Sequence, residues 1–96
     1  MAALIMVRPD SDWQVSGGLF DWTLEFLIPR LSDEKTAEWL RTIVAENLGN
    51  LWIPDLPDKT QEEIYDVLRT GVVAAGAHEL PPAAVDQLRE LVALTY

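Results

Sequence analysis

The sequence predicts an all-α fold, a small single-domain bundle of about four helices. Several segments carry apolar residues at the three- and four-residue spacing of one helix face, and glycines or prolines separate these segments. Hydrophobic residues make up 49% of the 96 residues, which is enough for one core without disulfides or metals. The whole chain, 1–96, is therefore expected to form one globular domain. The predicted helices span about 18–28, 33–48, 61–76 and 82–94, and the N-terminus before them is irregular or a short strand.

The N-terminal third fits two patterns. The stretch "FDWTLEF" alternates apolar and polar residues as a half-buried strand does, and the alternative fold is therefore α+β, with a hairpin (12–15 and 19–26) packed on three helices. The same stretch also fits one helical face. Leu27 and Ile28 extend that face and break the alternation, so the helix is favoured. Before it, "ALIMV" is expected to form a short strand or an apolar arm.

The second helix has signals at both ends. Ser32 is a plausible N-cap, and Gly49 can adopt the left-handed conformation that ends a helix. A helical wheel places Trp39 almost opposite the apolar stripe and Ile43 on its flank. Trp39 is therefore not expected in the main core. The stripe itself comprises Ala37, Leu40, Val44 and Leu48.

The third helix begins with a predicted capping box, Thr60 followed three positions later by Glu63. Gly71 and Ala75 lie one turn apart on its apolar stripe, and their small side chains predict that another helix crosses closely there. Gly76 is expected to mark the helix end. The stripe comprises Ile64, Val67, Leu68, Gly71, Val72 and Ala75.

The fourth helix follows Pro81 and Pro82, since proline is tolerated in the first helical turn. It is the expected partner of the Gly71/Ala75 face. Its apolar positions are Ala84, Val85, Leu88, Leu91 and Val92.

The charge of the chain narrows the classes of partner. Sixteen acidic and seven basic side chains give a formal net charge of −9, which repels the phosphates of nucleic acids and anionic lipid headgroups. We therefore expect no nucleic-acid partner and no membrane partner. The acidity either serves solubility alone or attracts a basic protein.

Localisation follows from two absences in the sequence. The N-terminal "AALIMV" is too short for a secretory signal and lacks the preceding positive charge. Asp21, Glu25 and Pro29 interrupt the longest apolar stretch before it reaches the roughly 20 residues that cross a bilayer. A cytoplasmic protein is expected.

No catalytic or cofactor motif is present. The chain has no cysteine, its single histidine is His78, and Ser16 lacks the preceding glycine of a nucleophile elbow. There is no phosphate-binding glycine loop and no set of metal ligands at the usual spacing. Asp21 and Glu25 are the least readily explained pair of carboxylates. We therefore expect no enzyme, no cofactor and no metal.

The segment 50–66 carries the candidate binding surface. It places five acidic residues after an aromatic residue, against the single positive charge of Lys59. Aromatic anchors supply most of the affinity of an interface, and complementary charge supplies speed and specificity. The segment can also be explained as a loop that leads into a helix with acidic residues at its start. The expected partner-binding residues are Trp52, Asp55, Asp58, Glu62, Glu63 and Asp66, with Trp39 and Tyr65 as further anchors.

These observations favour a non-enzymatic protein that binds a basic protein. The most concrete form is an immunity or antitoxin-type inhibitor, which would cover a basic surface of a toxin such as a nuclease. The alternative is a helical self-association or adaptor module that forms a homodimer through the Gly71/Ala75 face or through Trp39, with acidity serving solubility only.

Overall fold

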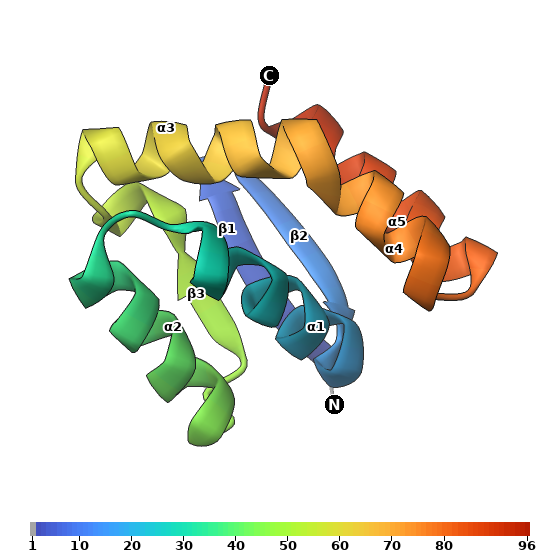
Figure 1. Cartoon of the computed structure of the whole chain (residues 1–96), viewed down its shortest axis with the longest axis horizontal. Coiled ribbons are helices and arrows are strands. Elements are labelled where there is room, and N and C mark those ends of the chain that lie inside the picture. The colour runs from blue at the N-terminus through green and yellow to red at the C-terminus, as the bar shows by residue number, and fades with distance from the viewer. Residues whose placement is uncertain (1) are drawn as a thin grey trace.

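Helices cover one face of a small β-sheet in the computed structural model, which describes residues 2–96 (Figure 1). The fold is α+β, so the prediction of an all-α bundle is wrong. The central strand β1 pairs with β2 in antiparallel and with β3 in parallel orientation. The strands are β1 (Ala2–Arg8), β2 (Ser11–Ser16) and β3 (Asn50–Trp52).

The helical segments lie close to the predicted ranges, with three differences. The second predicted helix ends three residues earlier. The third begins three residues earlier, at Asp58, and continues beyond Gly76 after one π-helical turn, η3. No helix within residues 2–96 is long and apolar enough to cross a membrane. The helical elements are α1 (Gly17–Leu27), η1 (Ile28–Arg30), α2 (Glu34–Ala45), η2 (Ile53–Asp55), α3 (Asp58–Val67), η3 (Leu68–Val72), α4 (Val73–Glu79) and α5 (Pro82–Leu94).

The hairpin lies earlier in the chain than the alternative α+β prediction placed it. The chain reverses direction at Pro9 and Asp10, between β1 and β2. Ser16 was expected in the hairpin turn, but its hydroxyl accepts a 3.2 Å hydrogen bond from the Leu19 backbone N–H and caps α1. The segment 19–26 is therefore helix, as the favoured prediction for that segment had it, and only the strand at 12–15 is present.

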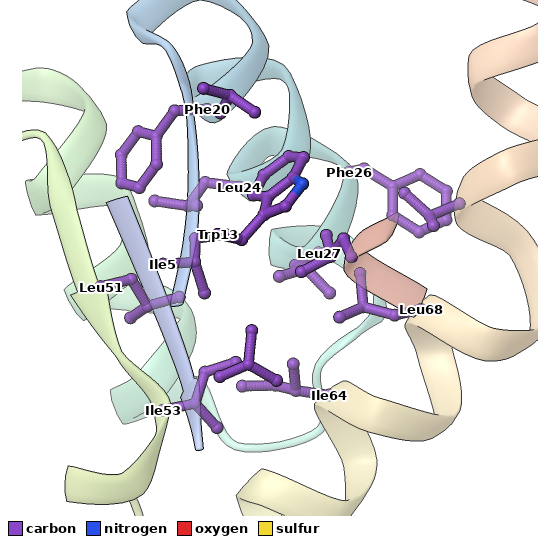
Figure 2. Close-up of a cluster of buried hydrophobic side chains, with 14 of the residues drawn as sticks. Ile5, Trp13, Phe20, Leu24, Phe26, Leu27, Leu51, Ile53, Ile64 and Leu68 are labelled. Atoms are coloured by element: carbon purple, nitrogen blue, oxygen red, sulfur yellow. The ribbon is translucent and has the colours of Figure 1, made fainter. Parts of the chain in front are cut away.

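The core lies between the inner face of the sheet and the helices. Ile5 of the central strand is opposite Trp13 of β2 and Leu51 of β3, and all three are buried. Figure 2 shows these side chains meeting residues from α1 and α3, including Leu24 and Ile64. Burying an aliphatic side chain of this size contributes about 1.5–3 kcal/mol. The Trp13 indole also donates a 2.8 Å hydrogen bond to the Gln87 carbonyl, which ties the sheet to α5.

Two glycines set the packing of the long helical segment that follows the sheet. Gly71 packs against the Phe26 ring of α1, since a Cβ there would lie 3.3 Å from the ring. Gly76 packs against Leu88 of α5, and a Cβ there would collide with that side chain. The prediction that Gly71 faces the C-terminal helix and that Gly76 ends its own helix is therefore wrong. Gly76 provides the close contact with α5.

Candidate partner-binding surface

Trp52 lies on the outer face of the sheet. Neighbouring residues of a strand point to opposite faces, and Leu51 points into the core, so Trp52 points away from the helices. Its side chain is 47% exposed, and its neighbour across the sheet is Met6 of β1. Trp52 is thus available as an aromatic anchor.

Trp52 also lies at the end of the sheet that borders α3. Met6 precedes Val7 in β1, and the Val7 carbonyl accepts a 2.7 Å hydrogen bond from the hydroxyl of Tyr65 in α3. That bond places the last turn of α3 beside the end of β1, and Figure 1 shows the head of β1 pointing at α3.

Tyr65 is not part of the surface, although the sequence suggested it as an anchor. Only 8% of it is exposed, and its hydroxyl is used inside the fold by the bond to Val7. Its position next to Ile64 on the buried side of α3 explains this. The prediction of Tyr65 as a partner-binding residue is corrected accordingly.

Three carboxylates form a row on the outward side of α3. Asp58, Glu62 and Asp66 are each four residues apart, and all three are exposed on the side away from Ile64. Four residues of helix advance by about 6 Å, so the row follows the helix axis. Asp55 in η2 is exposed just before it. We call Asp55, Asp58, Glu62 and Asp66 the acidic row.

Glu63 has a structural role. It is half-buried, and its carboxylate accepts a 2.9 Å hydrogen bond from the backbone N–H of Ser32. This contact ties the loop before α2 to α3. The predicted capping box is also wrong, since α3 begins at Asp58 after Pro57, and Thr60 is buried within it. Asp33, rather than Ser32, caps α2, by accepting from the Lys35 N–H.

The basic side chains form no ion pair with the acidic row within residues 2–96, although Lys59 lies exposed on the same helix. Arg8 and Arg69 both donate to the Thr95 carbonyl, and Arg30 donates to the Phe26 carbonyl. Within residues 2–96 the ion pairs are Arg41–Glu34 at 3.0 Å and Arg89–Asp86 at 2.7 Å, and neither involves the row. The negative potential of the row is therefore directed at solvent.

Trp39 is exposed but lies on another surface. It is 46% exposed on α2, in the helical layer, whereas Trp52 is on the opposite face of the sheet. The structure therefore does not bring the two tryptophans together with the acidic row as one surface.

Two further apolar residues are exposed that the sequence did not single out. Leu48 was predicted in the stripe of the second helix, but α2 ends at Ala45 and Asn47 has φ +55°, so Leu48 is 43% exposed and Ile43 is buried in the core instead. Tyr96 is 77% exposed beside Arg69, whose guanidinium lies 4.2 Å from the centre of its ring. Neither position had a pattern that set it apart.

A pocket of about 230 Å³ opens between α1 and α4. It contains Glu25, one of the two carboxylates that the sequence left without an explanation. His78, also in α4, is exposed and does not line this pocket. The lining residues are Trp22, Glu25, Phe26, Arg30, Ala75 and Glu79.

The part of the chain that the structure describes contains no group of three potential metal ligands. Comparison with known proteins adds no assignment, because no family model, no curated protein and no solved structure matches this chain.

Proposed function

We propose that this protein is a non-enzymatic inhibitor of the immunity or antitoxin type, which binds a basic surface of a toxin such as a nuclease. The acidic row carries this proposal. Its four carboxylates are exposed, lie in η2 and along one side of α3, and have no ion-pair partner within residues 2–96.

The acidic row and Trp52 contribute differently to the proposed complex, the row to the rate of association and Trp52 to the affinity. A row of fixed negative charge accelerates the encounter with a cationic surface and selects against acidic partners. The affinity then comes from an anchor that loses its contact with water, and Trp52 is the large exposed side chain nearest to the row along the chain. A nuclease fits as the partner because its substrate groove must be cationic to hold phosphates.

The decisive experiment reverses charge within the acidic row. The partner is first recovered from the protein's own cells at low salt and purified. Glu62→Lys/Asp66→Lys should then lower its affinity at least about tenfold, as expected when two attractive contacts become repulsive. Glu63 is left unchanged because it holds Ser32.

The matched control reverses two other exposed carboxylates, Glu38 in α2 and Glu46 directly after it, and Glu38→Lys/Glu46→Lys changes net charge by the same amount. Equal loss of affinity in both variants would mean that only net charge matters, and would remove the acidic row as the site. Inhibition itself is tested by co-expression, since the wild-type protein should restore growth to cells that express the purified partner. A partner that is harmless to those cells would overturn the inhibitor proposal.

Self-association is a second candidate, and the exposure of Trp39 favours it. The Gly71 side of the expected dimer face is already covered by Phe26. A dimer through Trp39 should dissociate in Trp39→Ala and remain stable at high salt, as sedimentation equilibrium can measure.

A further inference from the structure

The pocket between α1 and α4 has an aromatic wall. Trp22 and Phe26 are one helical turn apart on α1, and their rings stack with centroids 5.9 Å apart and an angle of 13° between the planes. Trp22 also reaches α4, because a Cβ added to Gly76 would lie 3.7 Å from the Trp22 ring. Both rings border the pocket.

The same wall already carries one guanidinium group. Arg30 follows Phe26 by one turn, and its guanidinium carbon lies 4.0 Å from the centre of the Phe26 ring. Its Nη1 donates a 2.7 Å hydrogen bond to the Phe26 carbonyl, so the side chain is held in place. A planar cation stacked on an aromatic ring is a favourable arrangement that arginine makes more readily than lysine. The Phe26 ring of this wall thus accepts a guanidinium group.

Two carboxylates flank the pocket on different helices. Glu25 lies on α1 and Glu79 lies at the end of α4, and both are exposed. Neither forms an ion pair within the described part of the chain, even though Arg30 lines the same pocket. Two negative charges and one positive charge leave a net charge of −1, which favours a cation. Carboxylates are also the acceptors that match the fork of guanidinium N–H donors.

The size of the pocket limits what it can hold. Its volume of about 230 Å³ is below the roughly 300–1,000 Å³ of pockets that hold drug-sized ligands. A single long side chain suits it better than a cofactor.

From these observations we propose that the α1–α4 pocket binds the guanidinium group of an arginine side chain presented by another protein. The guanidinium stacks against Trp22 and donates to Glu25 and Glu79. This site includes neither Trp52 nor any residue of the acidic row. The proposal for the pocket can therefore be refuted without affecting the proposed inhibitor surface, and the reverse is also true.

The test uses N-acetylarginine amide as the probe and the indole N–H resonance of Trp22 as the readout. Trp22→Phe assigns that resonance among the four tryptophans of the chain. The expected result is a saturable shift of the Trp22 signal at millimolar probe, with the signals of Trp39 and Trp52 unchanged. N-acetylcitrulline amide has nearly the same shape without the charge and should produce no saturable shift.

Variants separate a specific site from general attraction to an acidic protein. Glu25→Gln/Glu79→Gln should weaken probe binding at least about fivefold, whereas Glu38→Gln/Glu46→Gln, with the same change in net charge, should leave it within about twofold. Arg30→Gln removes the resident cation and should tighten binding. The proposal is overturned if the citrulline probe shifts Trp22 equally, or if both double variants bind the arginine probe alike. Either outcome leaves the test of Glu62 and Asp66 unaffected.

Discussion

The Tyr65 hydroxyl donates a 2.7 Å hydrogen bond to the Val7 carbonyl, and this bond joins α3 to the central strand. It forms where the pairing of β1 with β2 becomes irregular, between Met6 and Arg8. Tyr65 thus supports the end of the sheet next to which the acidic row and Trp52 are exposed.

Tyr65→Phe should therefore reduce the free energy of unfolding by about 1–2 kcal/mol, because a buried carbonyl loses a hydrogen-bond donor. Urea unfolding followed by circular dichroism measures this change. Tyr96→Phe is the matched control, because Tyr96 is 77% exposed, and it should change stability by less than about 0.5 kcal/mol. Equal stabilities of the two variants would show that the bond to Val7 contributes nothing.

Two glycine-to-alanine substitutions should have opposite effects. Gly76→Ala places a methyl group against Leu88 and should destabilise the protein by about 1–3 kcal/mol. Gly18 lies in α1, and a Cβ there would have no atom within 4 Å. Gly18→Ala should therefore stabilise the protein by about 0.4–1 kcal/mol, because alanine lowers the conformational entropy of the unfolded chain. Thermal unfolding of both variants shows whether each substitution raises or lowers stability. A stabilising Gly76→Ala would contradict the close packing of α4 on α5.

The tryptophans should separate into core and surface residues. Trp13→Phe removes the hydrogen bond to Gln87 and leaves a cavity, so it should cost about 1–3 kcal/mol of stability. Trp52→Phe should change stability by less than about 0.5 kcal/mol because the side chain is 47% exposed. Trp52→Ala should instead lower partner affinity at least about tenfold, as measured by calorimetry. Full affinity in Trp52→Ala would exclude it as an anchor.

The rate of association with the partner should fall as salt rises, and the acidic row should cause this fall. The association rate of the wild-type protein should fall at least about tenfold when ionic strength rises from about 0.05 to 0.5 M, because salt screens exposed charges. Glu62→Lys/Asp66→Lys should associate slowly at low salt and lose this dependence. Stopped-flow fluorescence measures both rates. A steep slope retained in the variant would place the steering charge elsewhere.

The helices could be predicted from the sequence because their apolar spacing is local, whereas the signals at their ends misplaced the start of α3 and the end of α4. Strands at "ALIMV" and at 12–15 were among the alternatives, but neither their pairing with each other nor β3 could be predicted. In β1, Leu4 and Met6 on the outer face are as apolar as Ile5 and Val7 on the inner face, so no alternation is visible. β3 has three residues, too few for any pattern, and its pairing partner lies far away in the sequence.

The candidate surface was predictable to the extent that it depended on helix periodicity. Asp58, Glu62 and Asp66 are exposed because they lie opposite Ile64, which the sequence shows. The burial of Tyr65 and the contact of Glu63 with Ser32 could not be predicted, because Val7 and Ser32 lie far away in the sequence. The α1–α4 pocket could not be predicted, since it exists only where α4 is placed beside α1.

The parallel pairing of β1 with β3 has a kinetic consequence. The β1–β2 hairpin closes over a short turn, whereas the contact between Leu4 and Asn50 requires a far longer chain segment to be gathered first, with its larger entropy of closure. Contacts of this separation slow folding, so β3 should join the sheet late, after α1 and α2 have packed against each other. During that interval the open edge of β1 is unpaired, and newly made chains would be most exposed to aggregation at this edge.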